Sequence, residues 1–382
     1  MEQIIIYSIT TGSIFFLSLV TLATPRHKNI HANIWLGFFL FTFGCLILDR
    51  VLFETHAYEP NPELKGLLEI TRFAMAPAMY FSVLYFTVPE FSFKRRDYLH
   101  FIPFFLFAFY IVIVFLHLTN SPFFSGYNNL PASVRRGVAL FMFTSIKLQM
   151  IVYWVLSYRK LIRHEKHTKL FVSTPDTISL RWFRYFLLGL GALIIISLNE
   201  ILQLIPALIP VTHYSYLILT FYVGFFSLRQ QEIYPYKEKD VADIQFIIND
   251  ADNDSKPSRI SPEELSIYKE RLLNIMQRER PYLNSELGLP ELAQIVNIST
   301  HDLSFVINQG FQENFFQFIN RYRIEEAKVL LVSPKHKHLS ILGIAFEAGF
   351  RSKTTFNTTF KKVTGLSPSQ FVEATEVSQN NK

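Results

Sequence analysis

The sequence predicts an all-α protein in two parts: an N-terminal polytopic helical membrane domain of about seven spans, and a C-terminal all-helical domain with two helix-turn-helix units. Half of the 382 residues are hydrophobic and 18% are charged, which is more apolar than an ordinary soluble protein. Residues 229–382 hold 39 of the 68 charged residues, and beyond position 261 apolar residues recur at helical spacing. We therefore expect a membrane domain at 1–228, a flexible linker at 229–260 and a soluble domain at 261–382.

Seven apolar stretches are candidates for membrane-spanning helices. Residues 3–25 form a run of 23 without Asp, Glu, Lys or Arg, and about 20 apolar residues suffice to span ~30 Å of hydrocarbon. The other candidates lie at 34–53, 67–88, 99–118, 137–158, 184–205 and 213–228. Buried helices of a soluble protein would have one polar face, which these stretches lack. We expect the first stretch to be an uncleaved span, because no basic residue precedes it.

The connections between these stretches predict the orientation in the membrane. One set of alternate connections holds twelve Lys and Arg residues, and the other set holds four. Basic residues favour the cytoplasmic side. We therefore expect a multi-pass protein of the cell's inner (plasma) membrane, with its N-terminus outside and its C-terminal domain in the cytoplasm.

The C-terminal part begins with a polar segment and a helix start. Residues 249–258 are almost free of apolar side chains and are typical of a flexible linker. Ser261, Pro262 and Glu264 then form the pattern of a capping box with proline at the first helical position. We expect the helix that follows to extend to about Arg280.

Further along, a degenerate repeat indicates two helix-turn-helix units. In the first copy a small residue, Ala293, is followed by a turn near Asn297 and by Leu303 and Ile307, four residues apart. The second copy repeats the pattern with Ala345, a turn at Gly349, and Phe356 and Phe360. A small residue lets a second helix cross closely, and two apolar residues hold that helix by one face. The other face is then free to enter a major groove of DNA.

These residues resemble a known family of proteins. The relevant segments are Arg323-Ile-Glu-Glu-Ala-Lys-Val-Leu-Leu331, Ile344-Ala345, Gly349-Phe350, Thr355-Phe356, Phe360-Lys361-Lys362, Gly365-Leu-Ser-Pro368 and Phe371. Residues 282–372 resemble the C-terminal DNA-binding domain of AraC/XylS-type transcription regulators. The resemblance implies that double-stranded DNA is a partner, bound through two helix-turn-helix units in successive major-groove segments. The base-facing residues that it implies are Thr300, His301, Ser304 and Phe305 in the first unit, and Lys353, Thr354, Asn357 and Thr358 in the second.

Charge and side-chain type favour the second unit as the main contact with DNA. Phe305 stands where the family often has a long polar or basic side chain, so we expect fewer direct base contacts from the first unit. Between Lys328 and Lys362 there are seven basic residues and one acidic residue. Since Lys and Arg bind phosphates, we expect phosphate binding there, with Lys361 and Lys362 among the contacts.

Polar residues inside the apolar stretches are the only candidates for a second site. They are Asp49, Arg72, Lys147, Asn199, Glu200 and Gln203. Charges in hydrocarbon are costly and are therefore usually functional or paired. Two interpretations stay open: interhelical ion pairs such as Lys147 with Glu200, and a ligand site open to the outside.

Two functions remain compatible with the sequence. The favoured one is a membrane-embedded, sequence-specific transcription regulator that senses an unknown small-molecule or lipid signal, with a homodimer as a possible form. The alternative is a transporter or membrane enzyme with a fused autoregulatory DNA-binding domain. We expect no catalytic residues, no cofactor and no metal, because no nucleotide or metal motif occurs and the single cysteine, Cys45, excludes a cysteine-rich site.

Overall fold

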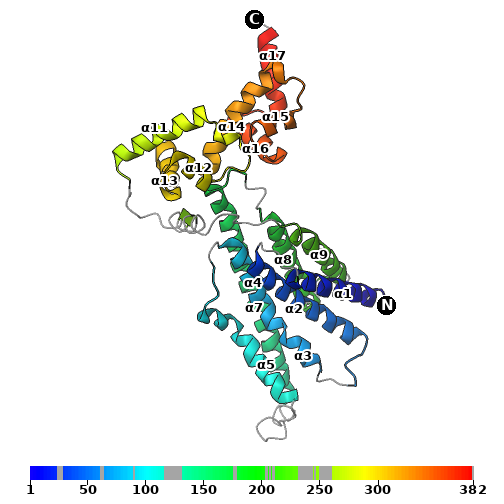
Figure 1. Ribbon diagram of the computed structural model, residues 1–382. Coiled ribbons are helices and arrows are strands. Elements are labelled where there is room, and N and C mark those ends of the chain that lie inside the picture. The colour runs from blue at the N-terminus through cyan, green and yellow to red at the C-terminus, as the bar shows by residue number, and fades with distance from the viewer. Residues whose placement is uncertain are drawn as a thin grey trace. The chain divides into compact units, whose positions relative to one another are not determined.

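A computed structural model gives the structure of the chain (Figure 1). It describes residues 1–23, 29–60, 64–88, 91–115, 131–174, 179–202, 205, 208, 211–230, 244, 247–248 and 260–380. The described residues form helices and no β-strand, although Val172 and Gly288 make one isolated antiparallel bridge. The chain divides into an N-terminal unit, Met1–Ile162 with Leu180–Ile233, and a C-terminal unit, Arg163–Ser179 with Tyr234–Lys382.

The N-terminal unit is a bundle of apolar helices. Its elements are α1 (Glu2–Ala23), α2 (Ile30–Glu54), α3 (Leu64–Ile70), α4 (Arg72–Thr87), η1 (Arg95–Phe101), α5 (Ile102–Phe115), α7 (Ala132–His167), α8 (Arg181–Leu202) and α9 (Val211–Ser227). The division between the two units falls inside α7. The last residues of this helix therefore belong to the C-terminal unit.

Helices α1 and α2 approach each other closely at a glycine. A side-chain carbon added at Gly37 would lie 2.6 Å from Cγ of Leu22, so no larger residue fits without movement. The hydroxyl of Ser18 donates a hydrogen bond of 2.8 Å to the carbonyl oxygen of Gly37. Small residues and hydroxyl bonds of this kind hold helices together where the surroundings are as apolar as the helices themselves.

Five helical segments are long and apolar enough to cross a membrane, judged by length and composition: Glu2–Ala23, Ile30–Glu54, Gly66–Thr87, Leu140–Leu170 and Arg181–Asn199. The sequence predicted seven. The other two predicted spans correspond to α5 and α9, which have 14 and 17 residues. Both fall short of the ~20 residues that a span requires, although residues 116–118 of one prediction lie outside the described part.

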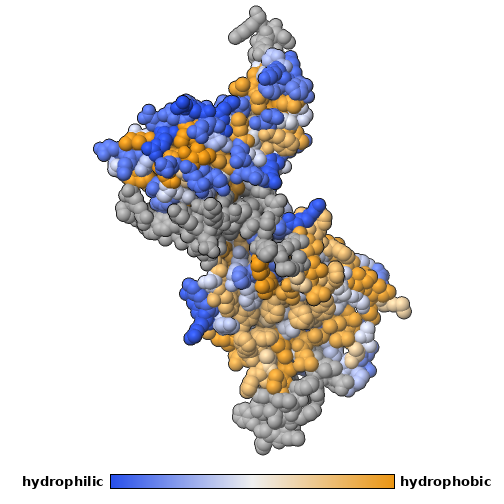
Figure 2. All heavy atoms as spheres, in the orientation of Figure 1, coloured by the Kyte–Doolittle hydropathy of each residue, from blue (hydrophilic) through white to orange (hydrophobic). Residues whose placement is uncertain are grey.

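Large apolar side chains are exposed along the helices of the N-terminal unit. Phe16, Phe141 and Ile218 are each more than two-thirds exposed, at 68%, 69% and 69%. Figure 2 shows such side chains spread over this unit, whereas polar residues are frequent on the C-terminal unit. A soluble monomer rarely exposes contiguous apolar surface of this extent.

The C-terminal unit is a set of shorter helices with its own cores. They are η3 (Thr168–Leu170), α11 (Pro262–Arg278), η6 (Pro281–Leu283), α12 (Leu289–Val296), α13 (Thr300–Phe311), α14 (Phe315–Val332), η7 (Pro334–His336), α15 (Ile341–Glu347), α16 (Lys353–Thr364) and α17 (Pro368–Asn380). The predicted capping box is present at α11, where the hydroxyl of Ser261 accepts from the backbone of Glu264 and the Glu264 carboxylate accepts from the backbone of Ser261. That helix ends at Arg278, close to the predicted Arg280.

Two apolar clusters lie on either side of α14. The first joins α11, α12, α13 and the beginning of α14, and it also includes Phe171, Ile244, Ile247 and Ile248. The second joins the end of α14 with α15, α16 and α17. Helix α14 therefore connects two small helical domains. The flexible linker predicted at 229–260 is described only in part. Residues 249–258 lie outside the described residues, whereas Ile244, Ile247 and Ile248 are buried in the first cluster and belong to the C-terminal unit.

Candidate nucleic-acid interface

The first helix-turn-helix unit consists of α12, a tight turn and α13. Asn297 ends α12 in the left-handed conformation, at φ 59°, which Asn adopts more readily than most residues. The hydroxyl of Ser299 then accepts a 3.0 Å hydrogen bond from the backbone N–H of Asp302 and caps α13. Ala293, Leu303 and Ile307 are buried, as the repeat predicted.

The second unit repeats this construction with α15 and α16. Gly349 makes the turn at φ 89°, and a side-chain carbon added there would lie 2.4 Å from the carbonyl oxygen of Tyr282. Only glycine fits both the conformation and the space. Ser352 caps α16 by accepting a 3.3 Å hydrogen bond from the backbone of Thr355. The inner face of α16 is held by Phe356 and Phe360, which are fully buried.

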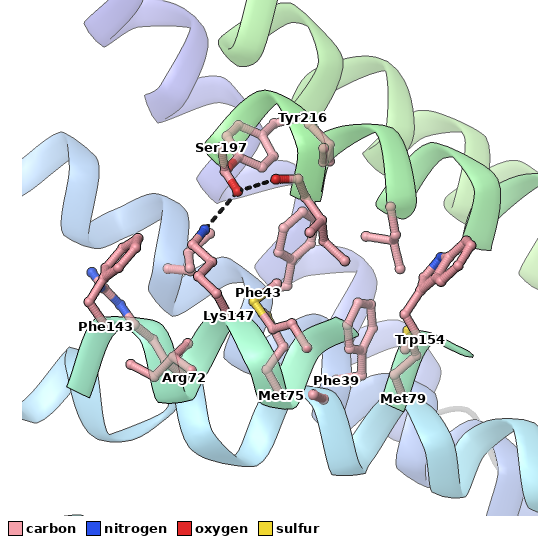
Figure 3. Close-up of a pocket in the computed structure, with 17 residues that line it drawn as sticks. Phe39, Phe43, Arg72, Met75, Met79, Phe143, Lys147, Trp154, Ser197 and Tyr216 are labelled. Atoms are coloured by element: carbon pink, nitrogen blue, oxygen red, sulfur yellow. Dashed lines mark hydrogen bonds between the residues drawn. The ribbon is translucent and has the colours of Figure 1, made fainter. Parts of the chain in front are cut away.

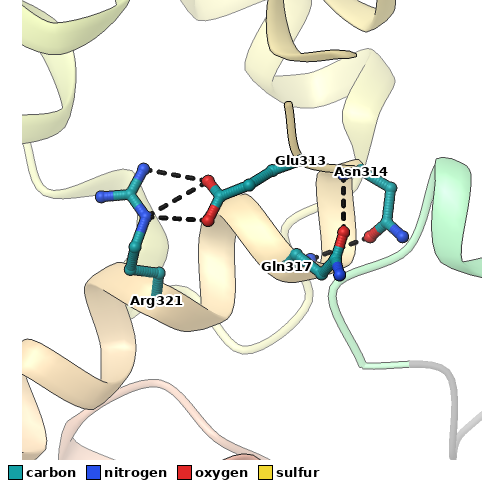
Figure 4. Close-up of polar contacts among 4 residues, drawn as sticks. All are labelled: Glu313, Asn314, Gln317 and Arg321. Carbon is teal, nitrogen blue, oxygen red and sulfur yellow. Dashed lines mark hydrogen bonds and ion pairs between the residues drawn. The ribbon is translucent and has the colours of Figure 1, made fainter. Parts of the chain in front are cut away.

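A polar corner fixes the angle between α13 and α14 (Figure 4). The guanidinium of Arg321 donates to both carboxylate oxygens of Glu313, at 3.0 Å from Nε to Oε1 and 3.0 Å from Nη2 to Oε2. Such two-point pairs restrict geometry as well as adding energy. Asn314 and Gln317 form a capping box at the start of α14. The helix that connects the two units therefore begins at a defined angle.

Arg323 on α14 is fully buried and connects the segment before α12 with the second helix-turn-helix unit. Its Nε donates to the carbonyl oxygen of Tyr282 at 2.7 Å, and its Nη2 donates to that of Asn284 at 2.8 Å. The guanidinium also lies over the ring of Phe350, 5.8 Å from its centre, directly after the turn of the second unit. Burial lowers the pKa of Arg323 to about 9, so the side chain is still charged at neutral pH.

Arg323 belongs to the motif that resembles the family, but no role was predicted for it. The sequence nevertheless held one indication that Arg323 is buried. Ile319, Arg323 and Ala327 follow one another at spacing four, and the two apolar residues are fully buried. A residue between them at this spacing must lie on the same, buried face of the helix. Two of its partners, by contrast, are backbone carbonyls, which leave no trace in side-chain patterns.

The residues predicted to face bases in the first unit are mostly packed into the protein. Thr300 and Ser304 are buried, and Phe305 packs against the apolar cluster. His301 lies 3.7 Å from the carboxylate of Asp302. In this structure α13 therefore presents few free side chains, in agreement with the expectation that rests on Phe305.

The residues predicted in the second unit lie together on the outer face of α16. Lys353, Thr354, Thr358, Lys361 and Lys362 are exposed, and Asn357 is partly exposed. The helix has no acidic residue. Two other basic residues counted above have acidic partners: Arg351 pairs with Glu286 at 2.6 Å, and Lys328 pairs with Glu325 at 2.8 Å. Of the five other basic residues counted there, three, Lys353, Lys361 and Lys362, lie on α16.

The second unit has a turn of fixed shape, a capped helix held by two buried aromatic residues, and an exposed basic outer face. These features define a DNA-binding helix-turn-helix domain. Comparison with known proteins agrees. Residues 292–374 match the family described as "Helix-turn-helix domain". The C-terminal end of the chain is an AraC-type helix-turn-helix domain, which confirms the resemblance found in the sequence.

Two kinds of relative share this region. The melibiose operon regulatory protein of Escherichia coli is 35% identical over 85 residues, which are 22% of this chain and 27% of that protein. An uncharacterized HTH-type transcriptional regulator of Staphylococcus aureus is 33% identical over 90 residues, 24% of this chain and 12% of that protein. The chain thus matches between about an eighth and a quarter of these relatives' lengths. No solved structure matches the chain.

A second candidate site is a cavity inside the N-terminal unit (Figure 3). Its volume is about 90 Å³, and its walls are mainly Phe, Met, Leu and Ile side chains from α2, α4, α7 and α8. Two cationic side chains, Arg72 and Lys147, also line it. The Lys147 ammonium donates a 2.7 Å hydrogen bond to the hydroxyl of Ser197.

The predicted polar set is only partly brought together at this cavity. Asp49 is buried and accepts from Arg72 at 2.5 Å and from the hydroxyl of Tyr58 at 2.7 Å. Asn199 lies apart from the lining and uses both atoms of its amide to hold the backbone of Ile205. The side chain of Glu200 and the whole of Gln203 lie outside the described residues. The pairing of Lys147 with Glu200 therefore stays a prediction.

Proposed function

We propose that the chain is a membrane-embedded, sequence-specific DNA-binding transcription regulator that senses a signal through its membrane helices. The observation that carries the DNA-binding part is the outer face of α16, with exposed Lys353, Lys361 and Lys362 on a helix without acidic residues. Thr354, Asn357 and Thr358 lie on the same helix, and their short polar side chains suit contacts with base edges.

The proposal places the N-terminal unit in a bilayer. Five helices of sufficient length and the exposed Phe and Ile side chains support this. The number of spans is odd with these five, and also with seven when the shorter α5 and α9 are included, so the N-terminus and the C-terminal unit lie on opposite sides. The proposal puts the N-terminus outside and the C-terminal unit in the cytoplasm, where DNA is. The twelve basic residues counted in one set of connections support the same orientation.

The proposed signal site is the cavity beside Arg72 and Lys147. Its apolar walls suit a small apolar or lipid-borne molecule, and its two cations favour one with an acidic group. Arg72 is paired with Asp49, which supports the interpretation of Arg72 as part of an interhelical ion pair. A ligand carboxylate would therefore be held chiefly by Lys147, which reaches the cavity from α7.

Two assays on the full chain, purified in lipid nanodiscs, test this function. The first selects duplexes from a random pool and measures their binding over a range of salt concentrations; we expect a defined sequence preference and a steep loss of affinity with salt. The second measures transport or turnover of candidate ligands. The alternative, a transporter or membrane enzyme with a fused DNA-binding domain, requires transport or turnover, and the proposed regulator requires neither.

A further inference from the structure

The connection between α7 and α8 is built into the C-terminal unit. Residues 168–174 lie more than a hundred positions before the residues that they contact. The backbone N–H of Leu289 donates to the carbonyl oxygen of Phe171 at 3.0 Å, next to the antiparallel bridge between Val172 and Gly288. The hydroxyls of Ser173 and Thr174 donate to the carbonyl oxygens of Leu287 and Ser285, at 2.6 Å and 2.9 Å.

The segment is a buried part of this unit. Phe171 and Ser173 have no exposed surface, and Val172 is 7% exposed. Phe171 belongs to the same apolar cluster as α12, α13 and the beginning of α14. A segment with a fully buried aromatic side chain and three hydrogen bonds to backbone groups of residues 285–289 is more than a loop resting on a surface.

Residues 168–174 also contact Arg323, the buried residue of α14. The hydroxyl of Ser173 accepts from Nη2 of Arg323 at 3.1 Å, and its carbonyl oxygen accepts from the amide of Asn320 at 3.0 Å. Arg323 in turn holds the carbonyl of Tyr282 and lies over Phe350. An unbroken series of contacts therefore leads from residues 168–174 to the turn that precedes α16.

We propose that residues 168–174 are a docking segment, a second and short attachment through which α7 and α8 hold and influence the DNA-binding domain. The proposal rests on the proposed function, because it takes both flanking helices to be membrane spans. A second attachment keeps the domain at high effective concentration next to its anchor, independently of residues 229–260. A rearrangement at the end of α7 would then be transmitted to Arg323 through Ser173, which lies a few residues after that helix.

The test cuts the chain within residues 229–260 and measures whether residues 168–174 still hold the C-terminal unit. A site for a sequence-specific protease is inserted after Lys239 in the full chain, and native membranes are treated with the protease. The cut lies ahead of the other early members of the apolar cluster, Ile244, Ile247 and Ile248, so that these stay with the released side. We expect the fragment from residue 240 onward to stay with the membranes, and to be released when Phe171→Asp places a charge in the apolar cluster. Lys166→Asp is the matched control, because Lys166 is exposed near the end of α7; we expect its fragment to be retained.

A cross-link provides a second measurement that needs no disruptive variant. Opposed residues of an antiparallel bridge have Cα atoms ~4.5–5.5 Å apart, within the range of a disulfide. In a Cys45→Ser background, Val172→Cys with Gly288→Cys should form a disulfide under mild oxidation and join the two fragments after cleavage. Lys166→Cys with Gly288→Cys should not.

Three outcomes overturn the proposal: release of the fragment from the otherwise unchanged chain, equal retention with Phe171→Asp, or absence of the cross-link. DNA binding by the uncut chain and its presence in the membrane fraction before cleavage are measured in parallel. A failure of docking with both of these intact leaves the proposed function standing. Loss of either one contradicts the proposed function itself.

Discussion

Asn357 and Lys361 stand one turn apart on the outer face of α16, and their side chains suit different parts of DNA. An amide donates and accepts in the major groove and distinguishes bases, whereas an ammonium binds phosphates of any sequence. We expect Asn357→Ala to change base preference, with a loss of about 1–3 kcal/mol of discrimination at one position. Lys361→Ala should weaken all duplexes alike and lower the salt dependence by about one phosphate contact. Binding to a panel of single-base variants of the selected duplex separates the two effects; an unchanged preference for Asn357→Ala would show that this face does not contact bases.

Two glycines in the left-handed conformation provide a matched pair for the second unit. Gly349→Ala introduces a carbon 2.4 Å from the carbonyl oxygen of Tyr282, while Gly365→Ala meets no atom within 4 Å. We expect Gly349→Ala to cost about 3 kcal/mol or more, from conformational strain and overlap together, and Gly365→Ala about 1–2 kcal/mol from strain alone. Hydrogen exchange of the α16 amides in the full chain measures both. Equal costs would mean that the close approach to Tyr282 is not maintained in solution.

At the scale of elements, α13 and α16 have the same construction and different surfaces. Both follow a residue in the left-handed conformation, and both have a serine cap. The residues predicted to face bases are packed in α13 and exposed in α16. The first unit is held to α14 by Arg321 and Glu313, and its contacts with bases stay a prediction.

The cap of α16 is testable by itself. Ser352→Ala removes the acceptor for the backbone N–H of Thr355, and loss of such a cap costs about 1 kcal/mol. We expect earlier fraying of α16 and a weaker affinity for DNA, with unchanged base preference. Ser352→Asn, which keeps an acceptor, should restore affinity. If it fails to do so, Ser352 contributes to DNA binding in some way other than as a cap.

At the scale of the whole molecule, topology is the first prediction to check. Reporter fusions at Asn61, Asn128 and Ile209 should report outside, and fusions at Lys94 and Lys237 should report inside. The physical reason is the twelve-to-four excess of Lys and Arg in the connections assigned to the cytoplasm. An outside signal at Lys237 would place the helix-turn-helix units away from DNA and contradict the proposed function.

The second prediction at this scale concerns transmission between the two parts of the chain. Insertion of one to four Gly/Ser residues after Asn253 should leave transcription without a periodic dependence on length, because residues 249–258 have the composition of a flexible linker. Association of two membrane domains would then raise the effective concentration of paired DNA-binding domains. A repeat near 3.6 residues would instead require a continuous helix through the linker. The same insertions in a Phe171→Asp background show whether the docking segment hides an effect of linker length on transcription.

Local spacing was sufficient to predict much of the C-terminal unit. Ala293, Leu303, Phe356 and Phe360 lie where the repeat placed them, because a helix repeats its contacts every three to four residues and so records its buried face in the sequence. Of the seven spans that apolar run length predicted, five correspond to helices long enough to cross a membrane. The number seven is not established, since α5 and α9 have only 14 and 17 residues.

The sequence by itself determined an all-helical chain with apolar helices first and two helix-turn-helix units last, with positive charge on the second of these units. Only the tertiary structure decided that residues 168–174 dock into the C-terminal unit and that Arg323 joins its parts. The physical reason is the kind of contact involved. Ser173 and Leu287 are 114 positions apart, and a hydroxyl bonded to a backbone carbonyl requires no particular partner side chain. Such contacts leave no periodic pattern, so they become visible only when the chain is folded.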